Sequence, residues 1–448
     1  MLHHSTSERP YGGLVLRAPL YRTAIVGLAV MYAAVFHFSA ASICDQFGGQ
    51  AVYRMCVPAA PSTLIYYSLL AIVPAMFLPS SPRVSSLIIF FVYVMHVFPS
   101  IAIYPYIDAN ERLGGLFPIF ESATFSLLGA RFVRAKNISL PRINVSRFWL
   151  ATVAGVSGVL AITILYFSFD FSFQLVSLFD VYDVRSEFKN QLLDTSNPFA
   201  AYLVTGSAYA LAPALVILSK VLIRERKVAS YALLGLGVFL SLSIYALAAF
   251  KSGVFIIAFT ILICYFPQIP NRKYMLYTIF GFGAFALMMV VLGVLDDTNP
   301  VFAHWYRRAF VVPGIHTNLF YNYIGNSISD GYPGMPSVVS RLYYGTDGSA
   351  NSGLYGDGLA RAGFVGAAFT VTFFGILLKI MDAVTTNLPS SLSTAFFLPT
   401  AYALSNSSTT SVMLTYGAVV SLICAYMLNE YLRRSRIGTH AGRGALAR

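Results

Sequence analysis

Lys251 is the first residue whose type and position raise a question of chemistry. It lies in the stretch AAFKSG, between the apolar segments VASYALLGLGVFLSLSIYAL and VFIIAFTILICYF. A charge at the centre of a bilayer costs about 2.5–3.5 kcal/mol on insertion scales. One interpretation is a lysine that extends its ammonium group to the headgroups. The other is a lysine that binds an anion at the membrane surface.

Further side chains suited to phosphate binding occur in two hydrophilic segments and at the start of a later apolar segment. Arginine holds phosphate oxygens through two parallel hydrogen bonds. Trp305 lies beside two such arginines and offers an aromatic face to a sugar ring. The candidates for substrate binding, with Lys251 and Trp305, are Arg307, Arg308, Arg341 and Arg361.

A second group of residues is suited to catalysis. Arg185 stands two residues before Glu187, so the arginine can hold phosphate or sugar while a carboxylate acts as general base. His316, like His304, is a candidate base because imidazole titrates near neutral pH. Asp357 precedes Arg361 by four residues and can orient its guanidinium toward a leaving group.

Each candidate also has an interpretation without chemistry. Arg185 can belong to a solvated salt-bridge cluster with the neighbouring acids, and the arginines beside Trp305 can anchor a helix at the membrane surface. Asp357 and Arg361 have the spacing of an ordinary ion pair within a helix, and histidines in loops often have no role.

The composition indicates the class of element that must position these residues. The chain has 448 residues, of which 57% are hydrophobic and 11% charged, and its mean hydropathy is +0.68. Soluble domains carry about 25% charged residues, and about 20 apolar residues cross a bilayer as a helix. The sequence therefore predicts an all-α, polytopic transmembrane bundle. Twelve spans are expected, at about 22–42, 62–79, 84–107, 114–132, 148–169, 198–222, 228–249, 252–268, 274–295, 357–381, 391–408 and 411–431.

The distribution of basic residues predicts the orientation. With both termini in the cytoplasm, most Lys and Arg residues fall in inner connections, as the positive-inside rule requires. The net charge of +12 is then a topology signal, and no nucleic-acid partner is expected. Nine basic residues remain outside: Arg54, Arg112, Arg185, Lys189, Lys251, Arg307, Arg308, Arg341 and Arg361.

Two further features belong to this topology. Cys44 and Cys56 fall in the first outer loop, where either a disulfide or two free thiols are expected. Glu121 falls inside the fourth span, where an acid is functional by default; the alternatives are a partner across the bundle and a shorter span.

One outer loop, at 296–356, is too long for a simple connection. The chain as a whole, 1–448, is expected to be a single membrane domain that carries this loop. Aromatic and basic residues alternate at its start, which is typical of a short helix lying in the membrane interface. The aromatic residues expected on that helix are Trp305, Tyr306, Phe310, Phe320, Tyr321 and Tyr323.

The layout resembles that of a known family. After the long loop comes NSGLYGDGLARAGFVGAAFTVTFFGILLK, with its Gly-rich run at Gly356–Gly366, and then the polar-ended span FFLPTAYALSNSSTTSVMLTYGAVVSLICAYM. Lys251 and Ser252 form a basic–serine pair in the turn before a mid-chain span. These features resemble the O-antigen polymerase (Wzy-like) family of bacterial polysaccharide polymerases, which is related to the O-antigen ligases.

The resemblance implies a glycosyltransferase of lipopolysaccharide biosynthesis in the bacterial inner membrane, with its active site facing the periplasm. Its substrate would be an oligosaccharide linked to undecaprenyl diphosphate, and its partners membrane lipids, a chain-length regulator and a flippase. Asp296 and Asp297 are a weak match to the metal-binding acids of other lipid-linked glycosyltransferases, and no cofactor and no metal ion are expected. The alternatives are an O-antigen ligase and a flippase or transporter of lipid-linked oligosaccharide. For an enzyme, Arg185, Lys251, Arg341 and at least one of Arg307, Arg308 and Arg361 are expected to converge in one outward cavity.

Overall fold

The computed structural model describes the greater part of the chain. The described residues are 18–47, 59–81, 83–106, 115–132, 138–169, 184–185, 187–188, 190–191, 199–223, 225–265, 271–295, 312–322, 335–344, 350 and 352–445. Within these ranges the chain forms helices, turns and short extended stretches, and no β-strand. Apart from the segment at 411–431, every predicted apolar segment begins and ends within a few residues of a helix or of a continuous run of helices.

Five described helices are long and apolar enough to cross a membrane: Val84–Tyr106, Arg147–Ser168, Tyr202–Leu222, Lys227–Ala248 and Gly353–Val384. Shorter apolar helices occur at Tyr21–His37, Pro61–Phe77, Leu116–Ala130, Lys251–Tyr265 and Leu276–Phe285. This pattern is that of a helical membrane protein.

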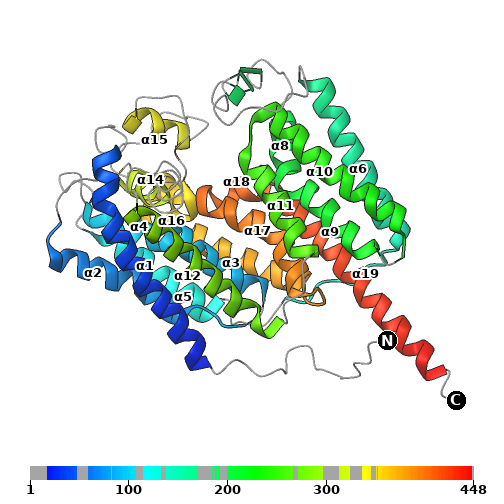
Figure 1. The fold of residues 1–448 in the computed structure, drawn as a ribbon, viewed down its shortest axis with the longest axis horizontal. Coiled ribbons are helices and arrows are strands. Elements are labelled where there is room, and N and C mark those ends of the chain that lie inside the picture. The colour runs from blue at the N-terminus through cyan, green and yellow to red at the C-terminus, as the bar shows by residue number, and fades with distance from the viewer. Residues whose placement is uncertain are drawn as a thin grey trace. The chain divides into compact units, whose positions relative to one another are not determined.

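The chain divides into two compact units, each built from two separate stretches. Unit 1 comprises Met1–Ala135 and Ile269–Gly375, and unit 2 comprises Lys136–Gln268 and Ile376–Arg448. Figure 1 shows the helices of both units.

Unit 1 is built around one buried run of helix. This run consists of α3 (Val84–Val92), the π-helical turn η2 (Tyr93–Val97), α4 (Phe98–Ala102) and η3 (Tyr104–Tyr106), and nearly all of its residues are buried. The helices that pack against its α4 segment are α2 (Pro61–Ile72), α5 (Leu116–Leu127) and α14 (Val312–Asn322). Unit 1 also contains α1 (Ala18–Phe47), η1 (Val73–Phe77), η5 (Leu128–Phe132), α12 (Asn271–Leu295), α15 (Met335–Tyr344) and the first part of α16 (Gly353–Val384).

The Gly-rich run that contributed to the family resemblance has a structural role in unit 1. Helix α16 is kinked at Ala362 and Gly363, and Gly363 has a φ of 58° that only glycine adopts readily. Across the kink the backbone of Gly358 touches that of Gly366, and a Cβ on Gly366 would collide with the carbonyl group of Gly358. Close packing of backbone against backbone therefore explains these glycines without any ligand.

Unit 2 is built around α9 (Ala212–Leu222), which continues α8 (Phe199–Gly206) and the π-helical turn η6 (Ser207–Leu211). Helix α9 contacts α6 (Arg147–Ser168), α10 (Lys227–Ala248), α11 (Lys251–Tyr265) and α17 (Ser390–Asn406), and α11 also runs beside α17 (Figure 1). The prediction of one uninterrupted span at 411–431 was wrong. Gly417, with a φ of 70°, separates α18 (Thr409–Leu414) from α19 (Ala418–Ala445).

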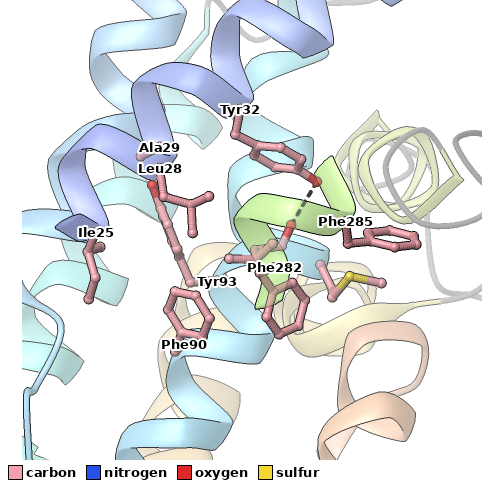
Figure 2. Close-up of a pocket in the computed structure, with 10 residues that line it drawn as sticks. Ile25, Leu28, Ala29, Tyr32, Phe90, Tyr93, Phe282 and Phe285 are labelled. Atoms are coloured by element: carbon pink, nitrogen blue, oxygen red, sulfur yellow. Dashed lines mark hydrogen bonds between the residues drawn. The ribbon is translucent and has the colours of Figure 1, made fainter. Parts of the chain in front are cut away.

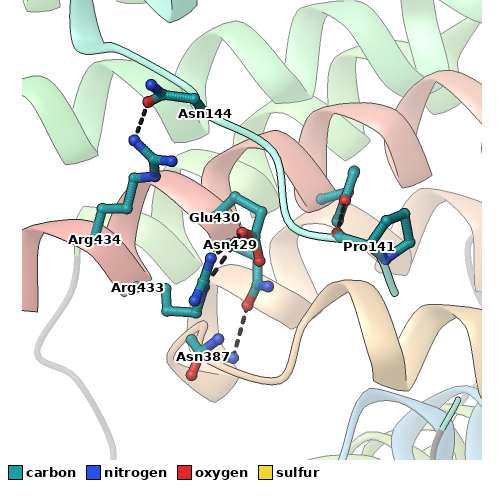
Figure 3. Close-up of polar contacts among 8 residues, drawn as sticks. Pro141, Asn144, Asn387, Asn429, Glu430, Arg433 and Arg434 are labelled. Carbon is teal, nitrogen blue, oxygen red and sulfur yellow. Dashed lines mark hydrogen bonds and ion pairs between the residues drawn. The ribbon is translucent and has the colours of Figure 1, made fainter. Parts of the chain in front are cut away.

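One end of unit 2 gathers the connections that the sequence assigned to a single side of the membrane. Helix α19 supplies the contacts (Figure 3): Arg434 donates to the side chain of Asn144, and the Asn429 Oδ1 atom accepts from the Asn387 backbone N–H at 2.7 Å. Tyr431 of the same helix contacts Glu225 at 3.4 Å. The connections before α6, between α9 and α10, and between α16 and α17 therefore lie together.

Candidate functional site

The turn between α10 and α11 carries Lys251 and has an unusual backbone. Ala249 adopts the left-handed conformation, with φ 50° and ψ 35°, and is the one described non-glycine residue with positive φ. This conformation costs an L-residue about 1–2 kcal/mol. The Ala249 carbonyl oxygen accepts a hydrogen bond from the backbone N–H of Lys251 at 3.0 Å. The turn thus fixes Lys251 as the first residue of α11.

Arg185 holds this turn from another part of the chain. Its Nε and Nη2 atoms both donate to the Ala249 carbonyl oxygen, at 3.3 and 3.2 Å. Phe188, one helical turn later, packs against Phe169 and Phe250 with ring centroids 5.3 and 6.2 Å away. The structure therefore brings Arg185 to the turn that carries Lys251. There the guanidinium group fixes the backbone of the turn and also adds a positive charge.

Three tyrosines adjoin the same turn. The Tyr209 hydroxyl lies 2.8 Å from the Ser252 hydroxyl, and Tyr209 itself comes from the π-helical turn η6, a distortion that is frequent at functional sites. Its ring stacks on Tyr402 at 6.3 Å and meets Tyr416 edge-on at 4.9 Å. Tyr209 is buried, whereas Tyr402 is 37% exposed. We call Arg185, Lys251, Ser252, Tyr209, Tyr402 and Tyr416 the turn cluster.

The turn cluster has the chemistry of an anion site with an aromatic border. Two cationic side chains can stabilise the negative charge of a phosphate group, and an exposed tyrosine ring can pack against a sugar. Glu187, the predicted base beside Arg185, has an exposed side chain.

The other described candidates belong to unit 1. Asp357 and Arg361 form an ion pair at 3.0 Å in the first part of α16, with the arginine side chain 59% exposed and the aspartate side chain 15% exposed. This is the ordinary i, i+4 helix pair. His316 is half-buried on α14, and Arg341 is exposed near the end of α15. The structure brings together Arg185 with the Lys251 turn, and Asp357 with Arg361; the convergence of the whole set stays a prediction.

Some predicted residues lie outside the part of the chain that the structure describes. They are Arg54, Cys56, Arg112, Lys189, Asp296, Asp297, His304, Trp305, Tyr306, Arg307, Arg308, Phe310, Tyr323 and the side chain of Cys44. The two cysteines whose side chains are described, Cys264 and Cys424, are free thiols.

The predicted interfacial helix is wrong for two of its aromatic residues. Phe320 and Tyr321 lie on α14 and are 0% and 1% exposed, inside unit 1. Gly314 allows α14 to approach α4 closely, since a Cβ at Gly314 would lie 2.7 Å from the carbonyl oxygen of Pro99. Burial raises the pKa of Tyr321 to about 12. The sequence could not distinguish an aromatic residue buried under a loop from one that faces lipid headgroups.

The sequence predictions included one buried polar residue of unit 1, Glu121, but not the polar residues that bond with it or with its partner. Ser100 on α4 donates to the Glu121 carboxylate, and Asn318 on α14 donates to the Ser100 carbonyl oxygen at 3.1 Å. The available signal was a polar residue within an otherwise apolar helix, but Ser100 and Asn318 are 218 residues apart in sequence. Nothing in the local pattern connects them.

Unit 1 also contains an apolar pocket between α1, the α3–η2 run and α12 (Figure 2). The Tyr32 hydroxyl donates to the Val94 carbonyl oxygen at 3.1 Å and closes one side of the pocket. A hydrocarbon chain suits this lining, and acid–base chemistry does not. The lining residues are Ile25, Leu28, Ala29, Tyr32, Phe90, Tyr93, Val94, Met95, Phe282 and Phe285.

Comparison with protein-family models, with curated proteins and with solved structures gave no match. Among the described residues, no group of three or more His, Cys, Asp or Glu side chains has a geometry that could hold a metal ion.

Proposed function

We propose that this protein is a polysaccharide polymerase of the bacterial inner membrane. It transfers a growing glycan from undecaprenyl diphosphate to an acceptor repeat unit at the periplasmic face. The observation that supports this proposal most directly is the double hydrogen bond of Arg185 to the turn that carries Lys251. The contact brings the Arg185 guanidinium to the turn that carries a second cationic residue from a separate segment, and positive charge near the leaving group stabilises a departing diphosphate.

In this proposal each part of the turn cluster has a role. Lys251 and Arg185 stabilise the charge that develops on the leaving diphosphate. Tyr402 packs against a sugar of the donor, and the Tyr209–Ser252 hydrogen bond keeps the turn in place. Trp305, Arg307, Arg308, Arg341 and Arg361 are proposed to bind the rest of the donor or the acceptor. Glu187, His316 and Asp357 are the candidate bases.

The proposed orientation draws support from unit 2. The connections that meet α19 include those the sequence assigns to the cytoplasm, whereas Arg185, Ala249 and Lys251 lie in two connections assigned to the periplasm and contact one another. Alternation of the two sets along the chain is what a bundle of membrane spans requires. The proposed topology of twelve spans with both termini inside is supported by this alternation and by the positive-inside rule.

A cellular experiment tests the function. A strain that lacks the gene is complemented with the wild-type protein, with Lys251→Ala or with Arg185→Ala, and its lipopolysaccharide is separated on a gel. Loss of a polymerase leaves single repeats on the lipid core, whereas loss of a ligase leaves bare core and lipid-linked polymer. Lys227→Ala is the matched control, because Lys227 is exposed at the opposite end of α10. Normal ladders from both site variants would reject the proposal.

An assay with purified protein separates enzyme from transporter. The protein is incubated with a synthetic repeat unit linked to a polyprenyl diphosphate, and the products are resolved by mass. A polymerase yields oligomers of the repeat and free polyprenyl diphosphate, and Lys251→Ala abolishes both. Unchanged substrate with the wild-type protein would argue against the enzyme.

One observation favours the second candidate, a flippase or transporter of lipid-linked oligosaccharide. Transporters place ionisable residues inside their spans, and Glu121 is 0% exposed within an apolar helix of unit 1. Movement of the labelled repeat unit across a proteoliposome membrane, without polymer formation, would decide for this candidate.

A further inference from the structure

Glu121 has one carboxylate oxygen satisfied and one without a partner. The side chain is completely buried on α5, and its Oε2 atom accepts a hydrogen bond from the Ser100 hydroxyl. Its Oε1 atom is buried and has no hydrogen-bond partner. A buried charge that is not compensated costs several kcal/mol, so this oxygen requires a positive partner.

Asn318 presents a second buried acceptor beside the same serine. Its Nδ2 atom donates to two carbonyl oxygens, that of Ser100 at 3.1 Å and that of Gly314 at 2.9 Å. These two contacts fix the orientation of the amide, because only the nitrogen can donate to a carbonyl oxygen. The Oδ1 atom of Asn318 then remains buried without a hydrogen-bond partner. Two acceptor oxygens without partners therefore belong to side chains that both bind Ser100.

The described surroundings supply no cationic side chain to Glu121. The elements of unit 1 that contact α5 carry titratable side chains with described positions, of which the one Lys or Arg is Arg361, 59% exposed and paired with Asp357. The others are Tyr66, Tyr67, Tyr93, His96, His316, Tyr321 and Tyr355. The Tyr355 hydroxyl donates to the backbone oxygen of Glu121 at 3.4 Å, so it does not serve the carboxylate. The Nε2 atom of His96 accepts a hydrogen bond from the Leu354 backbone N–H at 3.3 Å, so this atom carries no proton. No described Lys or Arg forms an ion pair with Glu121.

We propose that Glu121, Ser100 and Asn318 form a buried binding site for one small cation, which neutralises the carboxylate. The ligand atoms are hard oxygens of carboxylate, amide and hydroxyl groups, which suit a proton or a sodium ion and not a soft metal. The site does not depend on the proposed function, because it lies in unit 1 and shares no residue with the turn cluster. Binding of either the proton or the sodium ion would make the thermal stability of the folded protein depend on the concentration of that ion.

The test compares the thermal unfolding of wild-type protein and Glu121→Gln in lipid nanodiscs. Both proteins are measured in sodium chloride and in choline chloride, each from mildly acidic to mildly alkaline pH. A ligand that binds only the folded state raises Tm as its concentration rises. The rise is about 3–5 °C for each tenfold increase above the dissociation constant in a folding unit of 150–250 residues. Because His96 is present in both proteins, its own titration cancels in the difference.

A sodium ion and a proton at this site give different Tm responses. A sodium site raises the Tm of the wild-type protein in sodium relative to choline, and Glu121→Gln abolishes that rise. A proton site leaves the two salts equal, and the wild-type Tm rises relative to that of Glu121→Gln as the pH falls. Ser126→Ala is the matched control, because this buried hydroxyl on α5 bonds only to the Ser122 carbonyl oxygen, and it should keep the wild-type response. Identical salt and pH responses of wild type and Glu121→Gln would overturn the proposal.

A second measurement decides the question if Glu121→Gln does not fold. A hydrophobic carbodiimide modifies protonated carboxyl groups in apolar surroundings, and mass spectrometry locates the adduct in the wild-type protein. Modification of Glu121 that sodium suppresses identifies the sodium ion, and modification that increases only as the pH falls identifies the proton. Glu430, which is buried but paired with Arg433 at 2.6 Å, is the internal control and should stay unmodified. Glu121 modification that neither sodium nor pH changes, or no modification, would contradict the site.

Discussion

Arg185 donates two hydrogen bonds to the carbonyl oxygen of Ala249, from Nε at 3.3 Å and from Nη2 at 3.2 Å. This contact joins two connections that are 64 residues apart in sequence. It also places a guanidinium group at the turn that carries Lys251. The following predictions depend on this contact, on the backbone of the turn, and on the packing of the helices that present it.

Replacement of Arg185 should affect the turn through geometry as well as charge. Arg185→Lys keeps the positive charge but loses the planar fork that makes two bonds to one oxygen. Hydrogen bonds from charged groups contribute about 1.5–3 kcal/mol, so we expect a 10- to 100-fold loss of polymer formation by the purified protein. Arg226→Lys, the same substitution at an exposed arginine before α10, is the control and should keep full polymer formation. Full activity of Arg185→Lys would show that the fork is not needed.

Ala249→Gly should be tolerated, whereas Ala248→Gly should destabilise the protein. Both alanines are fully buried, so each variant loses one buried methyl group and that loss cancels in the comparison. Glycine at 249 relieves a left-handed strain of about 1–2 kcal/mol, and glycine at 248 weakens a helix end by about 1 kcal/mol. We expect Ala249→Gly to be the more stable variant by about 2–3 kcal/mol in thermal or denaturant unfolding. Equal stability would mean that the left-handed backbone at 249 carries no strain.

Tyr209 and Ser252 should be energetically coupled. Tyr209→Phe and Ser252→Ala each remove one partner of the 2.8 Å hydrogen bond. A double-mutant cycle should give a coupling energy of about 0.5–1.5 kcal/mol in unfolding. Thr372→Ser with Tyr209→Phe provides a control pair, because the Thr372 hydroxyl bonds within its own helix. Additive effects of Tyr209→Phe and Ser252→Ala would show that the bond does not stabilise the turn.

Gly366→Ala should strongly destabilise unit 1. Its new Cβ would collide with the backbone carbonyl group of Gly358, which cannot move away as a flexible side chain can. Overpacking of this kind costs about 1–3 kcal/mol or more. The control is Gly235→Ala on α10, where no atom lies within 4 Å of the new Cβ and helix propensity gains up to about 1 kcal/mol. The Tm of Gly366→Ala should fall and that of Gly235→Ala should rise in thermal unfolding. A Gly366→Ala variant with the wild-type Tm would reject the packing explanation of the Gly-rich run.

The orientation in the membrane can be tested with single cysteines in a cysteine-free background. A membrane-impermeant maleimide should label Glu187→Cys in intact spheroplasts and should label Arg226→Cys only after the membrane is permeabilised. Both wild-type side chains are exposed, so accessibility within the protein is matched. The opposite result would place the turn cluster in the cytoplasm, and the proposed use of a periplasmic diphosphate would fail.

The sequence predicted the helices well and their interactions poorly. Each of the apolar segments corresponds to described helix, because the length of an apolar run and its flanking polar residues are local properties. The break at Gly417, the kink at Gly363 and the burial of α14 were not predicted, since each depends on what packs against the backbone at that point. The aromatic residues of α14 show this most clearly. Phe320 is of a residue type that is common at the membrane interface, but its side chain is buried in the core of unit 1.

For the candidate site, too, the sequence determined the local features and the tertiary structure determined the contacts. By itself the sequence determined the class of protein, the positions of the apolar helices and the presence of Lys251 in a turn, because hydrophobicity and charge along the chain are sufficient for these. Only the tertiary structure decided that Arg185 binds that turn and that Tyr209 contacts Ser252. It also decided that Ser100 binds the acid in the fourth apolar helix and that Asn318 binds Ser100. These contacts join residues that are far apart in the chain, and their geometry is set by how the helices pack.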